Sequence, residues 1–547
     1  MGGIAMEMSG RTYKWGLAVL LALSLLMAAG CETEARQSTP AEPQTQDTVP
    51  QSAQLFAAEP ASITYPIDDS GEALTVFMPQ ETLQTDGAPV LQMVQEKTGI
   101  PVTYQLIPGD GYQWSLLACL WGESFPDLIW GVDETMLENQ TDPDTYAPLL
   151  VLNEYIQKAA PNYVQIVAAD EEKMHQAVDD KGNILRFLTF YDTPDQMIEY
   201  GPVIRQDLLD RYQLSLPETY EDWENALKQM QGDVDTPLLV TPAEIYNWDY
   251  LSAGMGISLA FDGDNQGFYQ VDGQVKYGPL EENFTQFITL MNHWYQENLL
   301  SNRFLDFNNT GSSEYLLKQA NGESAIFFLS NSQLASVTVL SEIEGFDIAL
   351  LQDPVLSRGE VSHIAPEREK TVYGAGFSVS ADCDNPELAV RFVDYLYSEE
   401  GIRLTNYVQQ DVTYQMEQGK PVYTDAVRKQ PDLLNGYTST SLSGVISQAR
   451  IQLQLEEAFL CASNAWNANK DSLYMLPEPL EMTPEVEEEL RGVMFDLATC
   501  AQTASIELMV GERPLSDIPA VQQELMDIGA ERCMELLQES LDAYLLR

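Results

Sequence analysis

The sequence predicts an α/β fold with a helical C-terminal region, and three observations lead to that prediction. Residues 73–78 (ALTVFM) and 101–106 (PVTYQL) are short strand-like runs, separated by a segment of helical periodicity that ends at Gly99. A strand, a crossover helix and a second strand form a βαβ unit, which implies a parallel sheet and a right-handed crossover. The last quarter of the chain instead carries long helical patterns, at 484–497 and at about 520–546.

The first region contains further elements of the same kind. Val90 and Val94 follow the helical period, and Gly99 is placed to cap that helix. Another helix is predicted at about 113–121, and the apolar run 126–130 (PDLIW) predicts a third strand. Residues from about 68 to 130 are therefore interpreted as an α/β lobe.

A second region begins with a strand at 201–205 (GPVIR) and a helix at 206–212. Thr219 is a suitable N-cap for the next helix, because Asp222 stands three residues later, as in a capping box. A long amphipathic helix is predicted at 284–300.

The chain then returns to strand and helix patterns. Residues 372–380 (VYGAGFSVS) predict one glycine-containing strand. Asn385, Pro386 and Glu387 supply a cap, a proline at the first helical position and an acid in the first turn, which together predict a helix start. That helix is expected to run toward Gly401.

The first thirty residues are predicted to be a signal peptide. Arg11 and Lys14 precede the apolar run 15–27, which is too short to span a membrane comfortably. The small residues 28–30 lead directly to Cys31, and this pattern resembles the lipobox of bacterial lipoproteins. The resemblance implies that Cys31 is lipidated and that the mature protein is anchored on the outer face of the cell membrane; an ordinary signal peptide followed by a chance cysteine is the alternative.

A disordered tether is predicted at 31–67. Residues 31–60 are rich in Gln, Thr, Pro and Ala and contain too little apolar surface to offset the entropy of ordering. A flexible coil of this length reaches on the order of 30 Å.

Composition excludes several functions. The chain has 547 residues, with 84 Asp and Glu against 28 Lys and Arg, for a formal net charge of −56. So negative a surface repels phosphate backbones, so no nucleic acid partner is expected. The chain has 8 Trp, 26 Tyr and 18 Phe, which separates it from acidic disordered chains.

Neither a metal site nor a cofactor site is predicted. The 3 histidines are far apart in the sequence and form no HExxH motif, and the cysteines form no CxxC motif. Residues 262–267 (DGDNQG) are weakly similar to the start of an EF-hand loop, but Gly273 occupies the position of its bidentate Glu. A tight turn is the better interpretation of that segment.

Several segments, in order along the chain, resemble the bacterial extracellular solute-binding proteins of carbohydrate ABC transporters, the maltodextrin-binding-like class. The segments are EKTGIPVTYQ at 96–105, FPDLIW at 125–130, APLLVLNEYI at 147–156, VIRQDLLDRYQLSLPETYEDW at 203–223, VDGQVKYGPL at 271–280, ANGESAIFF at 320–328, GFSVSADCDNPELAVRFVDYLYSEEGIRL at 376–404 and the region 482–517.

This resemblance implies the two-lobe, type II periplasmic-binding-protein-like fold, in which hinge strands join the lobes and ligand binds between them. Lobe 1 would comprise 68–178 plus 372–410, and lobe 2 would comprise 179–371 plus 411–547. The resemblance also implies a carbohydrate ligand, an ABC transporter permease as partner, a monomeric state and no enzymatic activity.

Sugar binding requires flat aromatic surfaces together with polar side chains. Trp130 and Asp133 follow the PDLI strand, at the carboxyl end where α/β sheets bind ligands. Relatives carry a similar aromatic segment at 244–250 (EIYNWDY), and they send the segment around Trp466 past the cleft. The predicted ligand-binding residues are Trp130, Asp133, Glu244, Tyr246, Trp248, Asp249, Tyr250, Tyr373 and Trp466.

Core packing is the alternative for each aromatic candidate. For Trp130 the sequence supports core packing and ligand contact equally. The 244–250 cluster lacks helix or strand periodicity, which favours a position in the cleft. Core packing is the expectation for four other tryptophans: Trp114, Trp121, Trp223 and Trp294.

Two other classes of function remain as alternatives. A secreted glycoside hydrolase would need only two carboxylates about 5–10 Å apart, which so acidic a chain could supply. The sequence contains no GxSxG, zincin or P-loop motif. A surface interaction protein would instead expose a large apolar patch and gain little stability from small ligands.

Overall fold

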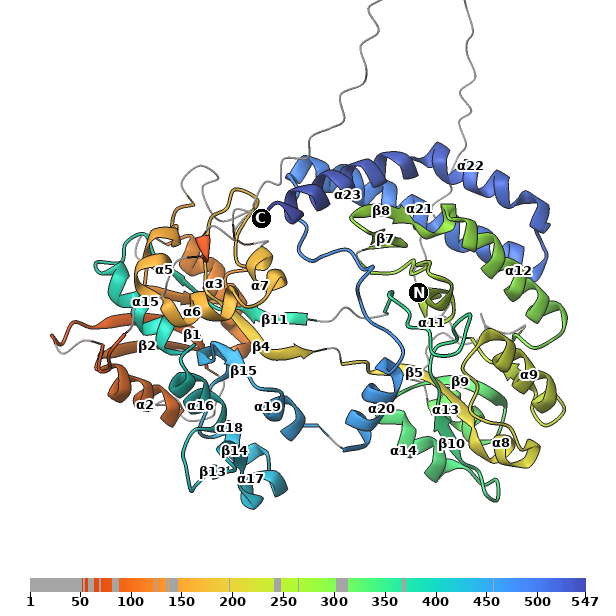
Figure 1. The fold of residues 1–547 in the computed structure, drawn as a ribbon, viewed down its shortest axis with the longest axis horizontal. Helices are drawn as coiled ribbons and strands as arrows, with labels where there is room; N and C mark the ends of the chain where they lie inside the picture. The colour runs from red at the N-terminus through yellow and green to blue at the C-terminus, as the bar shows by residue number, and fades with distance from the viewer. Residues whose placement is uncertain are drawn as a thin grey trace, which may run out of the picture. The chain divides into compact units, whose positions relative to one another are not determined.

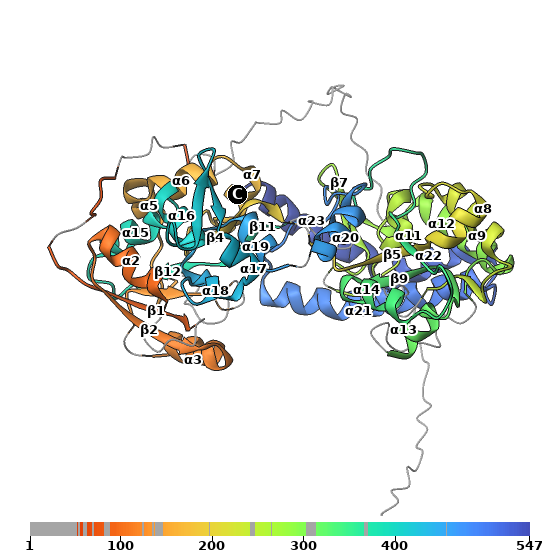
Figure 2. The ribbon, with the colours of Figure 1, turned by 90° about the horizontal axis from the view of Figure 1, so that it is seen from below.

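Figures 1 and 2 show the computed structural model of the chain. It describes residues 52, 55–57, 63–67, 70–80, 88–122, 125–133, 136, 146–195, 197–240, 247–263, 265–301, 313–365, 370–455 and 457–547. The predicted signal peptide, the lipidation site Cys31 and most of the predicted tether lie outside these residues. Residues 48–547 form one compact unit.

The first sheet has the strand order β12-β3-β1-β2. Strands β1 (Leu74–Gln80), β2 (Val102–Pro108) and β3 (Leu128–Trp130) are parallel, and α2 (Pro89–Thr98) connects the first two. The predicted βαβ unit is therefore confirmed. Strand β12 (Phe377–Val379) adds to the sheet antiparallel to β3, although it lies far away in the sequence.

Helices pack around this sheet. They are α3 (Tyr112–Leu120), α5 (Asn153–Ala159), α6 (Pro161–Val167), α7 (Glu171–Gln176), α15 (Pro386–Tyr395) and α16 (Glu399–Tyr407). The predicted start of α15 is confirmed, since the Asn385 side chain accepts a hydrogen bond from the Leu388 amide at 3.1 Å. At its other end, α15 supplies Asp394, whose carboxylate accepts from the Tyr163 amide at 2.8 Å and the Asn162 side chain at 2.7 Å. Asp394 thus caps the first turn of α6, which has no cap of its own.

A three-stranded sheet of order β11-β4-β15 follows. It contains β4 (Leu188–Asp195), β11 (Lys370–Ala375) and β15 (Val445–Ile446). The single strand predicted at 372–380 is wrong, because the chain passes from β11 to β12 at Gly376. A Cβ at Gly376 would lie 2.2 Å from the Phe187 carbonyl oxygen, so only glycine allows this approach.

The second region has its own sheet, of order β10-β5-β9-β6. Its strands are β5 (Tyr200–Arg205), β6 (Thr236–Leu238), β9 (Ser324–Ser330) and β10 (Ile348–Leu350). Its helices include α8 (Gln206–Tyr212), α9 (Tyr220–Met230), α11 (Asp249–Ser252), α12 (Glu282–Gln296), α13 (Ser313–Ala320) and α14 (Asn331–Leu340), and β7 (Phe268–Val271) forms a hairpin with β8 (Gln274–Tyr277). The predicted capping box of α9 is confirmed, since Thr219 and Asp222 exchange both hydrogen bonds.

The C-terminal region is helical, as predicted. It contains α19 (Gln448–Leu453), α20 (Glu457–Asn467), α21 (Pro484–Val510), α22 (Ile518–Ile528) and α23 (Ala530–Leu545). The single helix predicted at about 520–546 is wrong, because Gly529 adopts a φ of 131° and separates α22 from α23. Among the described residues, α21 alone is long and apolar enough to cross a membrane. However, α21 packs against α12 and α22 within a hydrophobic core (Figure 1).

Two large hydrophobic cores divide the chain. The first draws on residues between 56 and 190 and again between 377 and 445, and the second draws on 204–351 and 476–541. A small cluster that includes Tyr407, Tyr414 and Leu434 packs against Met93 of the first region. The predicted lobe boundaries at 178 and 410 differ from this grouping. We propose boundaries near 195 and 453 instead.

Candidate functional site

The carboxyl end of β3 forms a turn that carries Trp130 and Asp133. Gly131 has a φ of 82°, and its amide donates to the Gly376 carbonyl at 2.9 Å, which ties the turn to the end of β11. The Tyr112 hydroxyl donates to the Trp130 carbonyl at 2.6 Å, and the two rings lie 6.1 Å apart. Trp130 is half-buried, so part of its indole remains open at the edge where parallel sheets bind ligands.

A buried arginine supports this turn. The Arg186 side chain donates to the Val132 carbonyl at 3.0 Å. Burial lowers the pKa of Arg186 to about 10, while the nearby Asp133 carboxylate acts to raise it. The guanidinium therefore stays charged at neutral pH and complements Asp133, which also accepts from the Met136 amide at 2.9 Å.

A second aromatic surface lies on the sheet that follows. Tyr373 of β11 is 44% exposed. Its ring makes an edge contact with Tyr191 of β4, with centroids 5.6 Å apart. Tyr373 precedes Gly376 by three residues, so it lies close to the turn at Gly131.

The second region contributes an aromatic cluster at the start of β5. Tyr250 contacts Tyr200 at 5.8 Å and Phe328 at 5.5 Å, measured between ring centroids. Tyr200 and Tyr250 are partly exposed. Because β5 begins five residues after Asp195 ends β4, this link spans at most about 18 Å. The short link therefore holds the start of β5, with Tyr200, near the end of β4.

Trp248 and Asp249 lie inside the second core. Trp248 has no exposed surface, and its ring contacts Phe287 at 6.1 Å. Asp249 accepts from the Leu259 amide at 2.5 Å and the Ser258 hydroxyl at 2.9 Å, and burial raises its pKa to about 6. These contacts indicate packing and local bonding rather than ligand contact. Two other predicted residues, Glu244 and Tyr246, lie outside the described residues.

Trp466 is also fully buried. Its indole nitrogen donates to the Pro202 carbonyl at 3.0 Å. A Cβ at Gly201 would approach the indole to 2.6 Å, so the ring lies flat against the backbone of β5. We therefore leave Trp248, Asp249 and Trp466 out of the proposed site, which retains Trp130, Asp133, Tyr250 and Tyr373.

The expectation that Trp114 and Trp121 pack in a core is wrong. These side chains are 78% and 70% exposed, Trp114 on the outer face of α3 and Trp121 at its C-cap. The pattern was readable in the sequence, because Tyr112, Leu116 and Leu120 form the buried stripe of α3 and both tryptophans lie opposite that stripe. The same expectation is confirmed for Trp223 and Trp294, which have no exposed surface.

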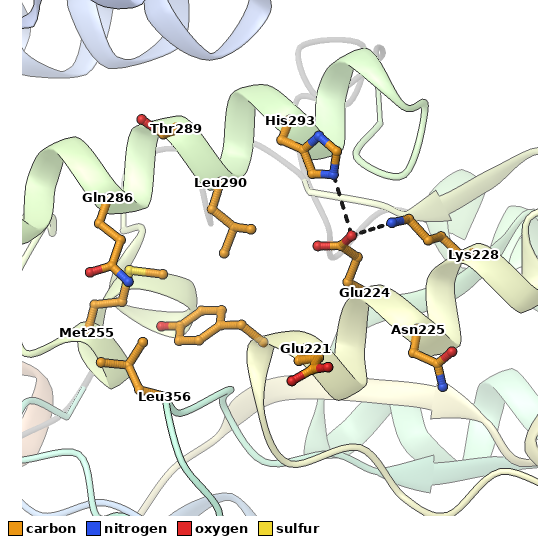
Figure 3. Close-up of a pocket in the computed structure, with 11 residues that line it drawn as sticks. Glu221, Glu224, Asn225, Lys228, Met255, Gln286, Thr289, Leu290, His293 and Leu356 are labelled. Atoms are coloured by element: carbon orange, nitrogen blue, oxygen red, sulfur yellow. Dashed lines mark hydrogen bonds and ion pairs between the residues drawn. The ribbon is translucent and has the colours of Figure 1, made fainter.

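A groove of about 710 Å³ lies between α9 and α12 of the second region (Figure 3). Glu224 is its central group. Glu224 contacts Lys228, His293 at 3.4 Å and the Trp294 indole nitrogen at 3.0 Å. Burial acts to raise the pKa of Glu224, but these hydrogen bonds lower it below its usual range.

None of the predicted ligand-binding residues that the structure describes lines this groove. The Glu224 carboxylate already has partners, and the Tyr220 side chain in the lining is only 6% exposed. The groove is therefore a weaker sugar site than the turn at Trp130. Among the described residues, no group of three His, Cys, Asp or Glu side chains could hold a metal ion.

Residues 81–402, more than half of the chain, match the family of bacterial extracellular solute-binding proteins. The chain belongs to that family. An extracellular or periplasmic location follows from this membership, and the family is one of binding proteins. No curated protein sequence matches the chain.

Solved structures support the same conclusion about the fold. An extracellular solute-binding protein from Bifidobacterium longum subsp. infantis is 14% identical, with a TM-score of 0.61 and coverage of 88% of this chain and 100% of that one. An HMO-binding, ABC-transporter-associated solute-binding protein from the same organism is 14% identical, with a TM-score of 0.60 and coverage of 87% and 99%.

A third structure is the ABC-transporter substrate-binding protein FusA of S. pneumoniae in complex with kestose, at 14% identity, a TM-score of 0.54 and coverage of 86% and 99%. At these identities the likeness concerns the fold alone. It confirms the predicted two-lobe α/β solute-binding-protein fold.

Proposed function

We propose that this protein captures a neutral oligosaccharide outside the cell and delivers it to an ABC transporter permease, held at the membrane by a lipid on Cys31. The family match over residues 81–402 carries the proposal. Solved proteins of similar fold bind carbohydrates, as the kestose complex illustrates.

The retained site residues fit a sugar ligand. Trp130 and Tyr373 offer partly open aromatic faces, on which the C–H face of a sugar ring can stack. Asp133 supplies a carboxylate that accepts hydrogen bonds from hydroxyl groups, and the Arg186 guanidinium lies near it. Tyr250 supplies an aromatic surface from the second region. Closure of the two lobes on a shared ligand would then shift the population toward the closed form.

Thermal-shift measurements across neutral glucan, mannan, xylan and fructan oligosaccharides test the ligand class. A bound saccharide at 100 times its Kd should stabilise the protein by about 2.7 kcal/mol. Trp130→Ala should then weaken binding of the stabilising saccharide roughly 3- to 10-fold. Phe495→Ala, which removes an aromatic side chain 66% exposed on α21, is the matched control and should leave binding unchanged.

The other functional classes give different results in the same samples. Release of shorter sugars during incubation with oligosaccharides would indicate a glycoside hydrolase. If no saccharide stabilises the protein, a surface interaction protein becomes the better explanation. Anchoring is tested by Cys31→Ala, which should move the protein from the membrane fraction to the medium. Retention of that variant at the membrane would refute a lipid anchor on Cys31.

A further inference from the structure

A small cavity lies where the end of α23 meets the segment that follows α7. Its volume is about 30 Å³, which is large enough for a water molecule. Four charged side chains line it: Asp179, Arg186, Glu481 and Arg547. Because Arg186 also donates to the Val132 carbonyl at 3.0 Å, one wall of this cavity is tied to the turn at residues 130–133, the Trp130 turn.

Arg547 holds the opposite wall in place. Its side chain is 1% exposed, its Nε donates to Asp180 at 2.6 Å, and its Nη2 lies 3.2 Å from Glu481. The guanidinium also lies over the Tyr544 ring, 4.8 Å from the centroid, and the Tyr544 hydroxyl donates to Glu172 of α7 at 2.9 Å. Figures 1 and 2 both show the end of α23 beside α7. Helix α23 of the second region is therefore fixed to the first region at this cavity.

Glu481 interacts electrostatically with both arginines. It pairs with Arg547 and accepts from the Asp180 amide at 3.3 Å. Burial lowers the pKa of Arg186, and Arg547 acts to lower it further. The Glu481 carboxylate acts in the opposite direction, so it offsets the repulsion between the two guanidinium groups. Without that negative charge the buried Arg186 would face a second cation, which is costly in a protein interior.

The charge of Glu481 changes in mildly acidic solution. Burial raises the pKa of Glu481 to about 6, while Arg547 acts to lower it and the Asp180 carboxylate acts to raise it. The ionisable groups that face Glu481 are Asp179 and Asp180 after α7, Arg186 before β4, Arg547 after α23, and Tyr146. As the pH falls through about 6, Glu481 becomes neutral, whereas arginine side chains stay charged.

We propose that Glu481 is a positioning residue for the Trp130 turn, and that the turn keeps its ligand-binding conformation only while the Glu481 carboxylate is charged. The charged carboxylate holds Arg186 in place on the Val132 carbonyl. The neutral carboxyl group leaves Arg186 and Arg547 to repel each other, and the turn loosens. This inference rests on the proposed carbohydrate-binding function and adds that the ligand is held more tightly at neutral pH than in acid.

The fluorescence of Trp130 reports the state of the turn without any ligand. The signal is the difference in emission between a protein with Trp130 and the same protein with Trp130→Phe, measured from pH 5 to pH 8. We expect this signal to change with a midpoint near pH 6 in wild type and to stay constant in Glu481→Gln.

Two further variants distinguish a titrating group from a merely structural one. Asp180→Asn should move the midpoint to lower pH, because it removes a charge that raises the pKa of Glu481. Arg547→Met should move the midpoint to higher pH, because it removes the charge that lowers that pKa. It should also reduce the amplitude, because Arg186 then faces no second cation. Shifts in the same direction for the two variants would overturn the proposal.

Other carboxyl groups titrate in the same range and supply the control. Burial raises the pKa of Asp249 to about 6 and that of Asp394 to about 7. Asp394→Asn is the matched control, because it removes a buried carboxyl group away from this cavity, and it should keep the wild-type midpoint and amplitude. Circular dichroism at pH 5 and pH 8 verifies that each variant is folded.

Calorimetric titrations with maltohexaose, cellohexaose, xylohexaose and mannohexaose extend the test to binding. For a saccharide that wild type binds, the affinity should fall roughly 5- to 10-fold between pH 7.5 and pH 5. Glu481→Gln should bind it weakly at both pH values. A wild-type affinity that is equal at both pH values would overturn the proposal, as would a Trp130 signal that is constant in wild type or still titrates in Glu481→Gln. If wild type binds none of these saccharides, the proposed function fails, whereas the fluorescence result still decides whether Glu481 controls the turn.

Discussion

Replacement of Trp466 by Phe separates a structural role from a ligand-binding role. The indole is fully buried, and its nitrogen donates to the Pro202 carbonyl at 3.0 Å. Phe removes part of the ring, which leaves a cavity worth about 1–2 kcal/mol. It also removes one hydrogen bond to the Pro202 carbonyl, which still accepts from the Leu351 amide at 3.0 Å, at a further cost of about 0.5–1.5 kcal/mol. We therefore expect Trp466→Phe to lower the free energy of unfolding by roughly 1.5–3.5 kcal/mol.

Trp248→Phe is the matched comparison. Trp248 is equally buried, but its indole nitrogen has no hydrogen-bond partner within the described part of the chain. Its replacement should cost only the packing contribution, about 1–2 kcal/mol or less. Urea unfolding followed by far-UV circular dichroism measures both free energies, and calorimetry measures saccharide affinity. Equal destabilisation by the two changes would contradict the assigned hydrogen bond, and a loss of affinity in a still-stable Trp466→Phe protein would return that residue to the ligand site.

Three further changes test other parts of the structure. Burial raises the pKa of Asp394 to about 7. The carboxyl group of Asp394 therefore favours the folded state at pH 4. That contribution, a few kcal/mol, disappears as the pH rises through 7. The urea midpoint measured from pH 4 to 8 should therefore change less with pH in Asp394→Asn than in wild type, and parallel curves would refute the assignment. The Arg547 side chain is only 1% exposed and pairs with Asp180 at 2.6 Å. Arg547→Met should lower the free energy of unfolding by about 3 kcal/mol. An unchanged thermal midpoint would be inconsistent with that pair. A Cβ at Gly254 would lie 1.9 Å from a backbone carbonyl oxygen, whereas a Cβ at Gly232 would meet nothing within 4 Å. Gly254→Ala should therefore destabilise the protein by more than about 2 kcal/mol. Gly232→Ala should stay close to wild type in the same thermal assay.

Local signals in the sequence predicted the elements well where local chemistry determines them. Gly99 ends α2 in a left-handed conformation, and Thr219 and Asn385 cap the helices that follow them, as their residue types indicate. Gly376 and Gly529 were harder to interpret. The first depends on how closely the Phe187 backbone approaches, and such contacts are determined by tertiary structure.

The candidate site was less predictable for the same reason. Burial of Trp466 depends on Pro202, a residue more than 260 positions away in the sequence. Trp114 and Trp121 were misassigned because their seven-residue spacing shows that they share a face but not which face is covered. The exposed face of the helix is identified only once the buried stripe is known, and that stripe consists of Tyr112, Leu116 and Leu120.

The interleaving of the two cores affects the order in which this chain can fold during synthesis. The first core needs strands as far along as Val445, and the second needs helices as far as Leu541. A ribosome that releases the chain from its N-terminus therefore makes nearly all of it before the second core can close, since neither core is built from one continuous segment. Until then the emerging polypeptide lacks the long-range contacts that would hold it compact. Completion of each core therefore waits for a segment made long after the strands that begin it.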